Sequence, residues 1–146
     1  LISLLCGCAS VPLAPTEQDT QAKEFKTADN KAALYIYRDE SFGGGVPMAI
    51  AVNGRSLGQT APDTYFYLEL EPGKYVIDSY AENLSELTVN LIAGQTCYVW
   101  QEVKLGLWAP QSALNVVDEA KGKAGVKECK LIAAPVFGED IAPLKP

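Results

Sequence analysis

Apolar and polar residues alternate in a series of short segments between residues 32 and 134. In residues 64–70, one side of an extended chain would carry Phe66, Leu68 and Leu70, while the other would carry two tyrosines and a glutamate. This period of two is typical of a β-strand with one face in a core. Similar segments recur roughly every ten residues, which favours an all-β sandwich. The expected strands are residues 33–38, 48–52, 55–58, 64–70, 74–80, 87–91, 97–105, 113–117 and 131–134.

The residues between these segments support the same fold. Asn53-Gly54 favours a type I′ hairpin turn, because both residues tolerate a positive φ. Pro72-Gly73 favours a type II turn, in which Pro72 fixes φ and Gly73 supplies a positive φ. A short helix is expected near the C-terminus, from the N-cap Asp118 to about residue 127. We therefore predict a small antiparallel β-sandwich over residues 32–134.

The first residues, LISLLCGC, join an apolar run to a small residue and a cysteine. This arrangement resembles a bacterial lipobox, in which a signal peptide is cut before a cysteine that then receives lipid. The resemblance implies that residues 1–7 are a signal peptide remnant and that Cys8 is lipidated. Cys6 is a second candidate, although Leu5 before it is large. In enterobacterial lipoproteins, an aspartate after the lipidated cysteine retains the protein at the inner membrane. Ala9 follows Cys8 here, so the resemblance implies the outer membrane.

Two segments flank the expected domain and have no sustained apolar pattern. Residues 8–31 are polar and contain two prolines, so we predict a lipidated cysteine followed by a flexible tether. A short amphipathic helix over residues 17–25 is an alternative for part of that segment. Residues 135–146 are rich in proline and are expected to form a loose tail.

The number of cysteines and the expected compartment together predict whether a disulfide forms. If Cys6 leaves with the signal peptide and Cys8 carries lipid, Cys97 and Cys129 remain. In an oxidising compartment this pair predicts a disulfide, and two buried free thiols are the alternative. Two cysteines without histidine supply too few ligands for zinc, so no metal site is expected.

Composition excludes several classes of function. The chain carries 12 Lys+Arg against 18 Asp+Glu, a net charge of −6, and has no histidine. An acidic chain without a basic stripe is a poor nucleic-acid binder. Without histidine the common Ser-His-Asp and Cys-His arrangements are absent, and no cofactor-binding fingerprint occurs, so we predict no cofactor and no enzyme. The alternative is a hydrolase that uses a carboxylate pair such as Glu69 and Glu71.

Two regions are candidates for binding a partner. Tyr98, Trp100 and Glu102 share one face of the longest expected strand, and an aromatic residue beside a charge is suited to binding. The alternative is that the two rings are covered by the C-terminal segment. The second candidate is the loop that contains Gly43, Gly44 and Gly45.

Residues 46–80 carry a more specific pattern, which consists of Asn53-Gly54, Gly58, Thr60, Pro62 and Leu70-x-Pro-Gly-x-Tyr75. This pattern resembles PEGA-type domains. The wider chain is similar to proteobacterial lipoproteins with a domain of unknown function. The resemblance implies a β-sandwich displayed in the cell envelope, with no catalytic site to carry over. We therefore expect a membrane-anchored interaction module for a protein or glycan partner.

Overall fold

The computed structural model describes residues 11–40, 45–134 and 136–146. These residues are mostly in β-strands, with two α-helices and one 3-10 helix. In chain order the elements are α1 (Thr16–Ala22), β1 (Ala32–Arg38), β2 (Met48–Val52), β3 (Arg55–Thr60), β4 (Thr64–Leu70), β5 (Gly73–Tyr80), β6 (Leu84–Leu91), β7 (Thr96–Leu105), β8 (Pro110–Val117), α2 (Glu119–Lys127), β9 (Lys130–Leu131) and η1 (Gly138–Asp140).

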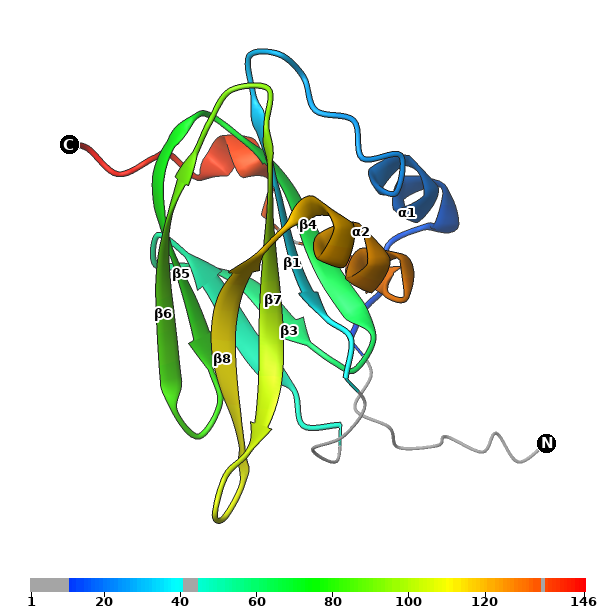
Figure 1. Ribbon diagram of the computed structural model, residues 1–146, viewed down its shortest axis with the longest axis vertical. Helices are drawn as coiled ribbons and strands as arrows, with labels where there is room; N and C mark the ends of the chain where they lie inside the picture. Colours follow the sequence, from blue (N-terminus) through cyan, green and yellow to red (C-terminus); the bar gives the residue numbers. More distant parts are fainter. Residues whose placement is uncertain (1–10, 41–44, 135) are drawn as a thin grey trace.

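The strands form two sheets that pack against each other (Figure 1). One sheet has five strands in the order β8-β7-β1-β4-β9, and the other has four in the order β3-β2-β5-β6. The expected two-sheet, mostly-β fold with a short helix near the C-terminus is therefore confirmed. The pairing is not purely antiparallel, because β1 runs parallel to β7 and β4 runs parallel to β9.

The core between the sheets is built from the alternating apolar residues of the strands. Ile36, Phe66 and Ile77 are all buried there. At the β2–β3 turn, Asn53 and Gly54 have φ values of 50° and 76°, as a type I′ turn requires. The Asn53 side chain also accepts a hydrogen bond from the Val76 N–H at 2.8 Å. This turn therefore fixes β5 as well as closing its own hairpin.

Strand β1 is buried along its whole length. Leu34 and Ile36 enter the core between the sheets, whereas Tyr35 and Tyr37 enter a second apolar cluster on the other side of the five-stranded sheet. Helices α1 and α2 cover this side (Figure 1). A strand with both faces buried need not alternate with polar residues. The helical layer was therefore not evident from the strand pattern.

Helix α2 begins as expected at Asp118, whose carboxylate accepts a hydrogen bond from the Lys121 N–H at 2.8 Å. Its two glycines each weaken a helix by about 1 kcal/mol relative to alanine. Both are buried against the sheet, where a Cβ would overlap the Tyr98 side chain at Gly122 and the Tyr37 ring at Gly125. The glycines therefore allow α2 to lie directly on two aromatic rings.

Residues 11–31 do not form a flexible tether, so that prediction is wrong for this part of the chain. Leu13 forms a β-bridge with Ile132, and the Ala14 N–H donates to the Leu131 carbonyl at 2.9 Å. Helix α1 (Thr16–Ala22) follows and overlaps residues 17–25, for which a helix was the alternative. Contacts with a distant part of the chain order this segment, and local sequence does not show them. Cys8 lies outside the described residues.

The C-terminal expectations also need correction. The strand expected at residues 131–134 is the two-residue β9, which pairs with β4. The described part of the expected loose tail contains η1, the buried Ile141 and a β-bridge between Leu144 and Lys74. The prolines in this part of the sequence leave no strand pattern. The buried Ile141 and the backbone hydrogen bond from Leu144 to Lys74 nevertheless hold the segment against the domain.

The predicted disulfide is wrong, because Cys97 and Cys129 are free thiols. Cys97 pairs with Leu34 near the start of β1, whereas the Cys129 thiol donates to the carbonyl of Arg38 at the end of β1, at 3.4 Å. Four residues of strand span about 13 Å, and a disulfide needs Cα atoms within about 7 Å. The two thiols also lie on opposite faces of the sheet. Burial raises the pKa of Cys97 to about 11.

Candidate functional site

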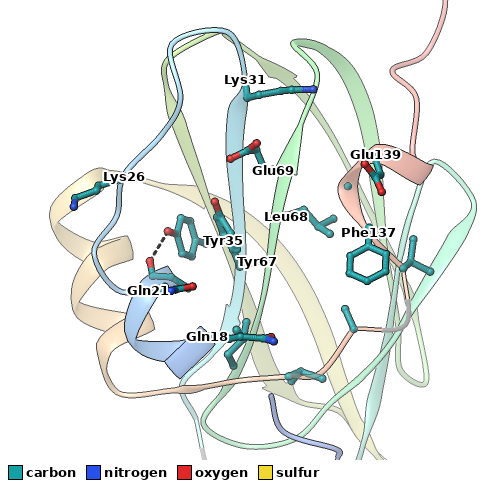
Figure 2. A pocket seen from close by; sticks show the side chains of 16 residues that line it. Gln18, Gln21, Lys26, Lys31, Tyr35, Tyr67, Leu68, Glu69, Phe137 and Glu139 are labelled. Carbon is teal, nitrogen blue, oxygen red and sulfur yellow. Dashed lines mark hydrogen bonds between the residues drawn. The ribbon is translucent and has the colours of Figure 1, made fainter. Parts of the chain in front are cut away.

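A groove lies on the outer face of the five-stranded sheet, between α1 and the C-terminal segment (Figure 2). Its volume is about 630 Å³, within the range of roughly 300–1,000 Å³ that is usual for small-molecule sites. Residues 67–69 of β4 and Tyr35 of β1 form the floor, and residues 136–139 line the side opposite α1. Leu131, Ile132 and Ala134 complete the lining. The groove is therefore assembled from segments near both ends of the chain.

The floor belongs to a layer of aromatic rings. The Tyr35 ring lies 4.9 Å from the Tyr67 ring, 5.3 Å from Tyr98 and 5.5 Å from Phe25, measured between centroids. The Tyr35 hydroxyl donates to the Ala22 carbonyl at 2.7 Å. Burial raises the pKa of both Tyr35 and Tyr67, so both rings stay uncharged at physiological pH. Tyr67 is only half-buried and presents part of its ring to the groove.

Helix α1 forms one wall, and Asp19 fixes it to the sheet. The Asp19 carboxylate accepts hydrogen bonds from the Tyr65 hydroxyl at 2.6 Å, the Leu131 N–H at 3.3 Å and the Lys23 ammonium at 3.0 Å. Burial alone would raise the pKa of Asp19, but the hydrogen bonds from Tyr65 and Lys23 outweigh it and lower the pKa. The charged carboxylate therefore holds the helix in place.

The opposite wall carries Phe137, whose side chain is 68% exposed. The neighbouring Gly138 lies so close to the backbone of Glu69 that a Cβ would overlap the Glu69 carbonyl. The Phe137 N–H donates to the Asp140 carboxylate at 3.2 Å, which closes the turn of η1. The close approach at Gly138 and this turn hold the exposed ring over the groove.

Polar and charged side chains surround the aromatic floor. Lys26, Lys31, Glu69 and Glu139 all line the groove (Figure 2). Lys31 forms an ion pair with Glu71, and the hydrogen bond from Lys31 to Glu71 raises the pKa of the lysine. The two lysines and two glutamates balance each other, so these side chains give the groove no strong net charge.

The strand face proposed for binding is largely covered. Tyr98 is buried under α2. Trp100 is half-buried, its indole N–H donates to the Asp39 carboxylate at 2.9 Å, and the Lys121 ammonium lies 4.0 Å from its ring centroid. Glu102 accepts a hydrogen bond from the Asn115 amide at 3.2 Å. Tyr98 is therefore not available to a partner, and the other two side chains already have contacts within the chain.

The glycine loop is only partly described. Gly43 and Gly44 lie outside the described residues. Gly45 has a φ of 70°, and a Cβ at this position would meet nothing within 4 Å. This position therefore faces open space.

A separate polar network lies between the sheets. Gln101 is buried, accepting from the Thr60 hydroxyl at 2.6 Å and donating to the Ser79 hydroxyl at 2.8 Å. Arg38 is fully buried and donates to the carbonyl oxygens of Val46 at 2.7 Å and Thr60 at 3.3 Å. These side chains link the two sheets.

Sequence reasoning missed the groove because its walls come from the segments read as tether and tail. The only local signal was the outward-facing pair Tyr67 and Glu69 on β4. Among residues 11–40, 45–134 and 136–146, no group of three or more acidic or cysteine side chains is placed to hold a metal ion. In the same residues, none of the helices has the length and apolar character needed to cross a membrane.

Comparison with known proteins gives the chain a family. A protein of Haemophilus influenzae described as "Uncharacterized protein" is 29% identical over 130 residues, which cover 88% of this chain and 77% of the relative. No solved structure matches the chain. Residues 28–113 match the family described as "Protein of unknown function (DUF2846)". This match spans β1 to β7 and the first part of β8, so α1, α2, β9 and η1 lie outside it. Because the match covers more than half of the sequence, the chain belongs to the DUF2846 family.

Proposed function

We propose that this chain is a lipid-anchored protein of the bacterial envelope and that the groove beside α1 binds a glycan. The observation that carries the binding proposal is the composition of the groove. It combines an exposed Phe137 ring, a partly exposed Tyr67 ring and polar side chains of both charges in a volume of about 630 Å³. This combination suits a ligand that has apolar faces and many hydroxyl groups.

The chemistry of a sugar fits these side chains. The C–H faces of a pyranose ring stack on aromatic rings, whose faces are weakly negative. The hydroxyl and amide groups of a glycan require hydrogen-bond donors and acceptors, which Gln18, Gln21 and Glu69 supply around the floor. A groove with balanced charge also favours a neutral ligand over a strongly anionic one.

An extended peptide fits the groove less well. Peptides commonly bind by adding a strand to a free sheet edge. The edge strand β9 has two residues, and the neighbouring Ile132 is already bridged to Leu13. The sheet edge that borders the groove is therefore occupied by the chain's own N-terminal segment.

The hydrolase alternative requires two carboxylates that face one cleft. The pair expected for it does not meet this requirement, because Glu69 lines the groove whereas Glu71 does not and is paired with Lys31. Glu139 is the second carboxylate in the groove, but the exposed aromatic rings beside it favour binding. We therefore retain a binding function.

The lipid anchor rests on the sequence LLCGC, in which Gly7 precedes Cys8 and small residues surround the cleavage position. The PEGA-like turn motifs of residues 46–80 belong to the same proposal, since they resemble domains displayed in the envelope. A triacylated cysteine holds a protein stably in a membrane, because each buried methylene contributes about 0.8 kcal/mol. Ala9 after Cys8 favours the outer membrane. The expected test result is that Cys8→Ser leaves the protein unprocessed and without lipid.

Glycan binding is tested by calorimetry with a defined probe, an oligosaccharide of N-acetylglucosamine. Phe137→Ala removes an exposed ring without opening the core and is expected to weaken binding about tenfold, since an aromatic contact contributes roughly 0.5–1.5 kcal/mol. Val116→Ala is the matched control, because Val116 is also an exposed apolar side chain and does not line the groove. Equal affinities for both variants, or no binding of this probe or of a glucose oligosaccharide, would contradict the proposal.

A further inference from the structure

Six of the exposed large apolar side chains gather at one end of the sandwich, which we call the apolar end. They are Val46, Tyr80, Leu84, Leu105, Leu107 and Trp108. The β5–β6 and β7–β8 hairpins extend to this end together (Figure 1). Hydrogen bonds between Asn83 and Ser112 join the two hairpins, at 2.8 Å and 2.9 Å. The apolar end is therefore a continuous feature of the fold.

The β7–β8 hairpin is the most exposed part of this end. Leu105, Leu107 and Trp108 are 82%, 95% and 91% exposed. Soluble proteins seldom leave so much apolar surface together in water unless it contacts something. Between residues 103 and 117 the only charged side chain is Lys104, in a chain whose net charge is −6. A surface that buries the β7–β8 hairpin would therefore dehydrate no carboxylate within it, whereas the exposed Glu82 at the β5–β6 tip has to stay at the level of water and headgroups.

The ordered N-terminal segment sets how far the domain lies from a lipid anchor. The Ala133 N–H donates to the Pro12 carbonyl at 2.9 Å, and Val11 packs against the core between the sheets. Only two residues separate Val11 from Cys8, and the three steps between their Cα atoms span about 10 Å when extended. The lipid proposed at Cys8 would therefore hold the domain directly against the bilayer.

The place where this segment joins the sheet follows from the strand register. Leu13 bridges Ile132, which follows the Leu131 that pairs with Tyr65. Tyr65 pairs with Tyr37, and Tyr37 pairs with Trp100, five residues before Leu105. The N-terminal segment thus joins the sheet about level with the middle of β7, and Leu105 lies about 17 Å further along that strand. The short linker keeps the domain close to the bilayer, and the exposed apolar side chains favour the apolar end as the part that contacts it.

We propose that the apolar end inserts into the interfacial region of a lipid bilayer, with Trp108 at the level of the headgroups. Tryptophan is enriched at this depth because its ring is apolar and its N–H remains hydrogen-bonded. The inference deepens the proposed function and rests on the lipid anchor at Cys8. It gives the domain a fixed orientation, with the two β-hairpins on the membrane and α1 and the groove on the side of the molecule.

The chain allows a direct spectroscopic test, because it has two tryptophans. In Trp100→Phe, emission comes from Trp108 alone. The full-length lipidated variant is reconstituted into phosphatidylcholine vesicles and its emission is measured with and without brominated lipid. We expect a shift to shorter wavelength and strong quenching by the brominated lipid. The matched control is Trp108→Phe, in which the half-buried Trp100 should show neither change.

Two outcomes overturn the inference. If Trp108 keeps the emission of a water-exposed indole while the lipidated protein floats with the vesicles, the anchor stands and the membrane contact of the apolar end is wrong. If Trp108 shifts without lipid, and more so at higher protein concentration, a second copy of the chain covers the apolar end instead.

A second measurement separates this inference from the anchor. In a chain that begins at Ala9, which has neither the apolar leader nor the lipidated cysteine, binding to the same vesicles depends only on the domain. Changing Leu105 and Leu107 to Gln should weaken that binding at least about tenfold. Ile92→Gln should leave it unchanged, since Ile92 is exposed at the opposite end, between β6 and β7. Equal binding of all three proteins would contradict the inference, whether or not Cys8 carries lipid.

Discussion

Replacing Gly125 by alanine should destabilise this protein, although the same change stabilises most helices. Gly125 lies in α2, where alanine would improve helix formation by about 1 kcal/mol. In this structure a Cβ at Gly125 would lie 2.7 Å from Cζ and 2.8 Å from Cδ2 of Tyr37. Carbon atoms in contact are normally about 3.5–4.0 Å apart. The new methyl group and the ring therefore compete for the same space.

The overlap cannot be relieved cheaply. Tyr37 is fully buried on β1, between β4 and β7, so neither its ring nor its backbone has room to move. Overpacking a rigid core costs about 1–3 kcal/mol. After the gain in helix propensity is subtracted, we expect the free energy of unfolding to fall by up to about 2 kcal/mol.

Urea unfolding of a small set of variants measures this effect. Ala124→Gly is the control for propensity alone, because Ala124 is exposed on α2, and it should cost about 1 kcal/mol. Tyr37→Val removes the ring, and in that background Gly125→Ala should become neutral or stabilising. Tyr37→Phe keeps the ring and should preserve the penalty. It also removes a buried hydroxyl that has no hydrogen-bond partner among the described residues, so Tyr37→Phe alone should not reduce stability.

The reasoning fails if Gly125→Ala raises the stability of the otherwise unchanged protein. It also fails if Gly125→Ala has the same effect in the Tyr37→Val background as in the parent, because the penalty would then not come from the ring.

Three further predictions concern other contacts. Asp19→Asn should lower the free energy of unfolding near neutral pH by about 1–2 kcal/mol. Because the folded pKa is depressed, this loss should disappear as the pH falls below 3.8 and through the folded pKa, as urea unfolding would show. Mass spectrometry after alkylation in denaturant, without reductant, should find both Cys97 and Cys129 modified, and a Cys97–Cys129 cross-linked peptide would contradict the structure. Burial raises the pKa of Glu40 from 4.5 to about 7, so its contribution to stability should decline between these pH values. Glu40→Gln should therefore remove this decline and stabilise the protein above pH 7 by on the order of 1 kcal/mol.

Much of the sandwich could be predicted from local patterns. The alternation in residues 64–70 and the turn residues Asn53-Gly54 act over a few neighbours, and their spacing determines strand and hairpin directly. The N-cap at Asp118 is local in the same sense. Where a few adjacent residues determine the conformation, the sequence was sufficient.

The candidate site could not be predicted in this way. Asp19 is an ordinary acidic residue in sequence, and its role depends on Tyr65 and the Leu131 N–H, which only the fold brings near. Phe137 lies in a proline-rich stretch that has no periodic pattern, so nothing local indicated an ordered ring. The groove arises from contacts between distant segments, and a single sequence contains no direct signal for them.

The same reliance on distant contacts affects how the protein folds. The central strand β1 is buried on both faces and pairs with β4 on one side and with β7 on the other. The pairing of β1 is complete only when distant residues meet, such as Ala33 and Thr96. The sequence separation is larger still for the N-terminal segment, because Leu13 pairs with Ile132. Such long-range pairing slows folding, because the loop must close before the contacts form. A chain exported from its N-terminal end would present β1 as an unpaired apolar strand until most of the polypeptide has followed, and a bound chaperone would then protect it from aggregation.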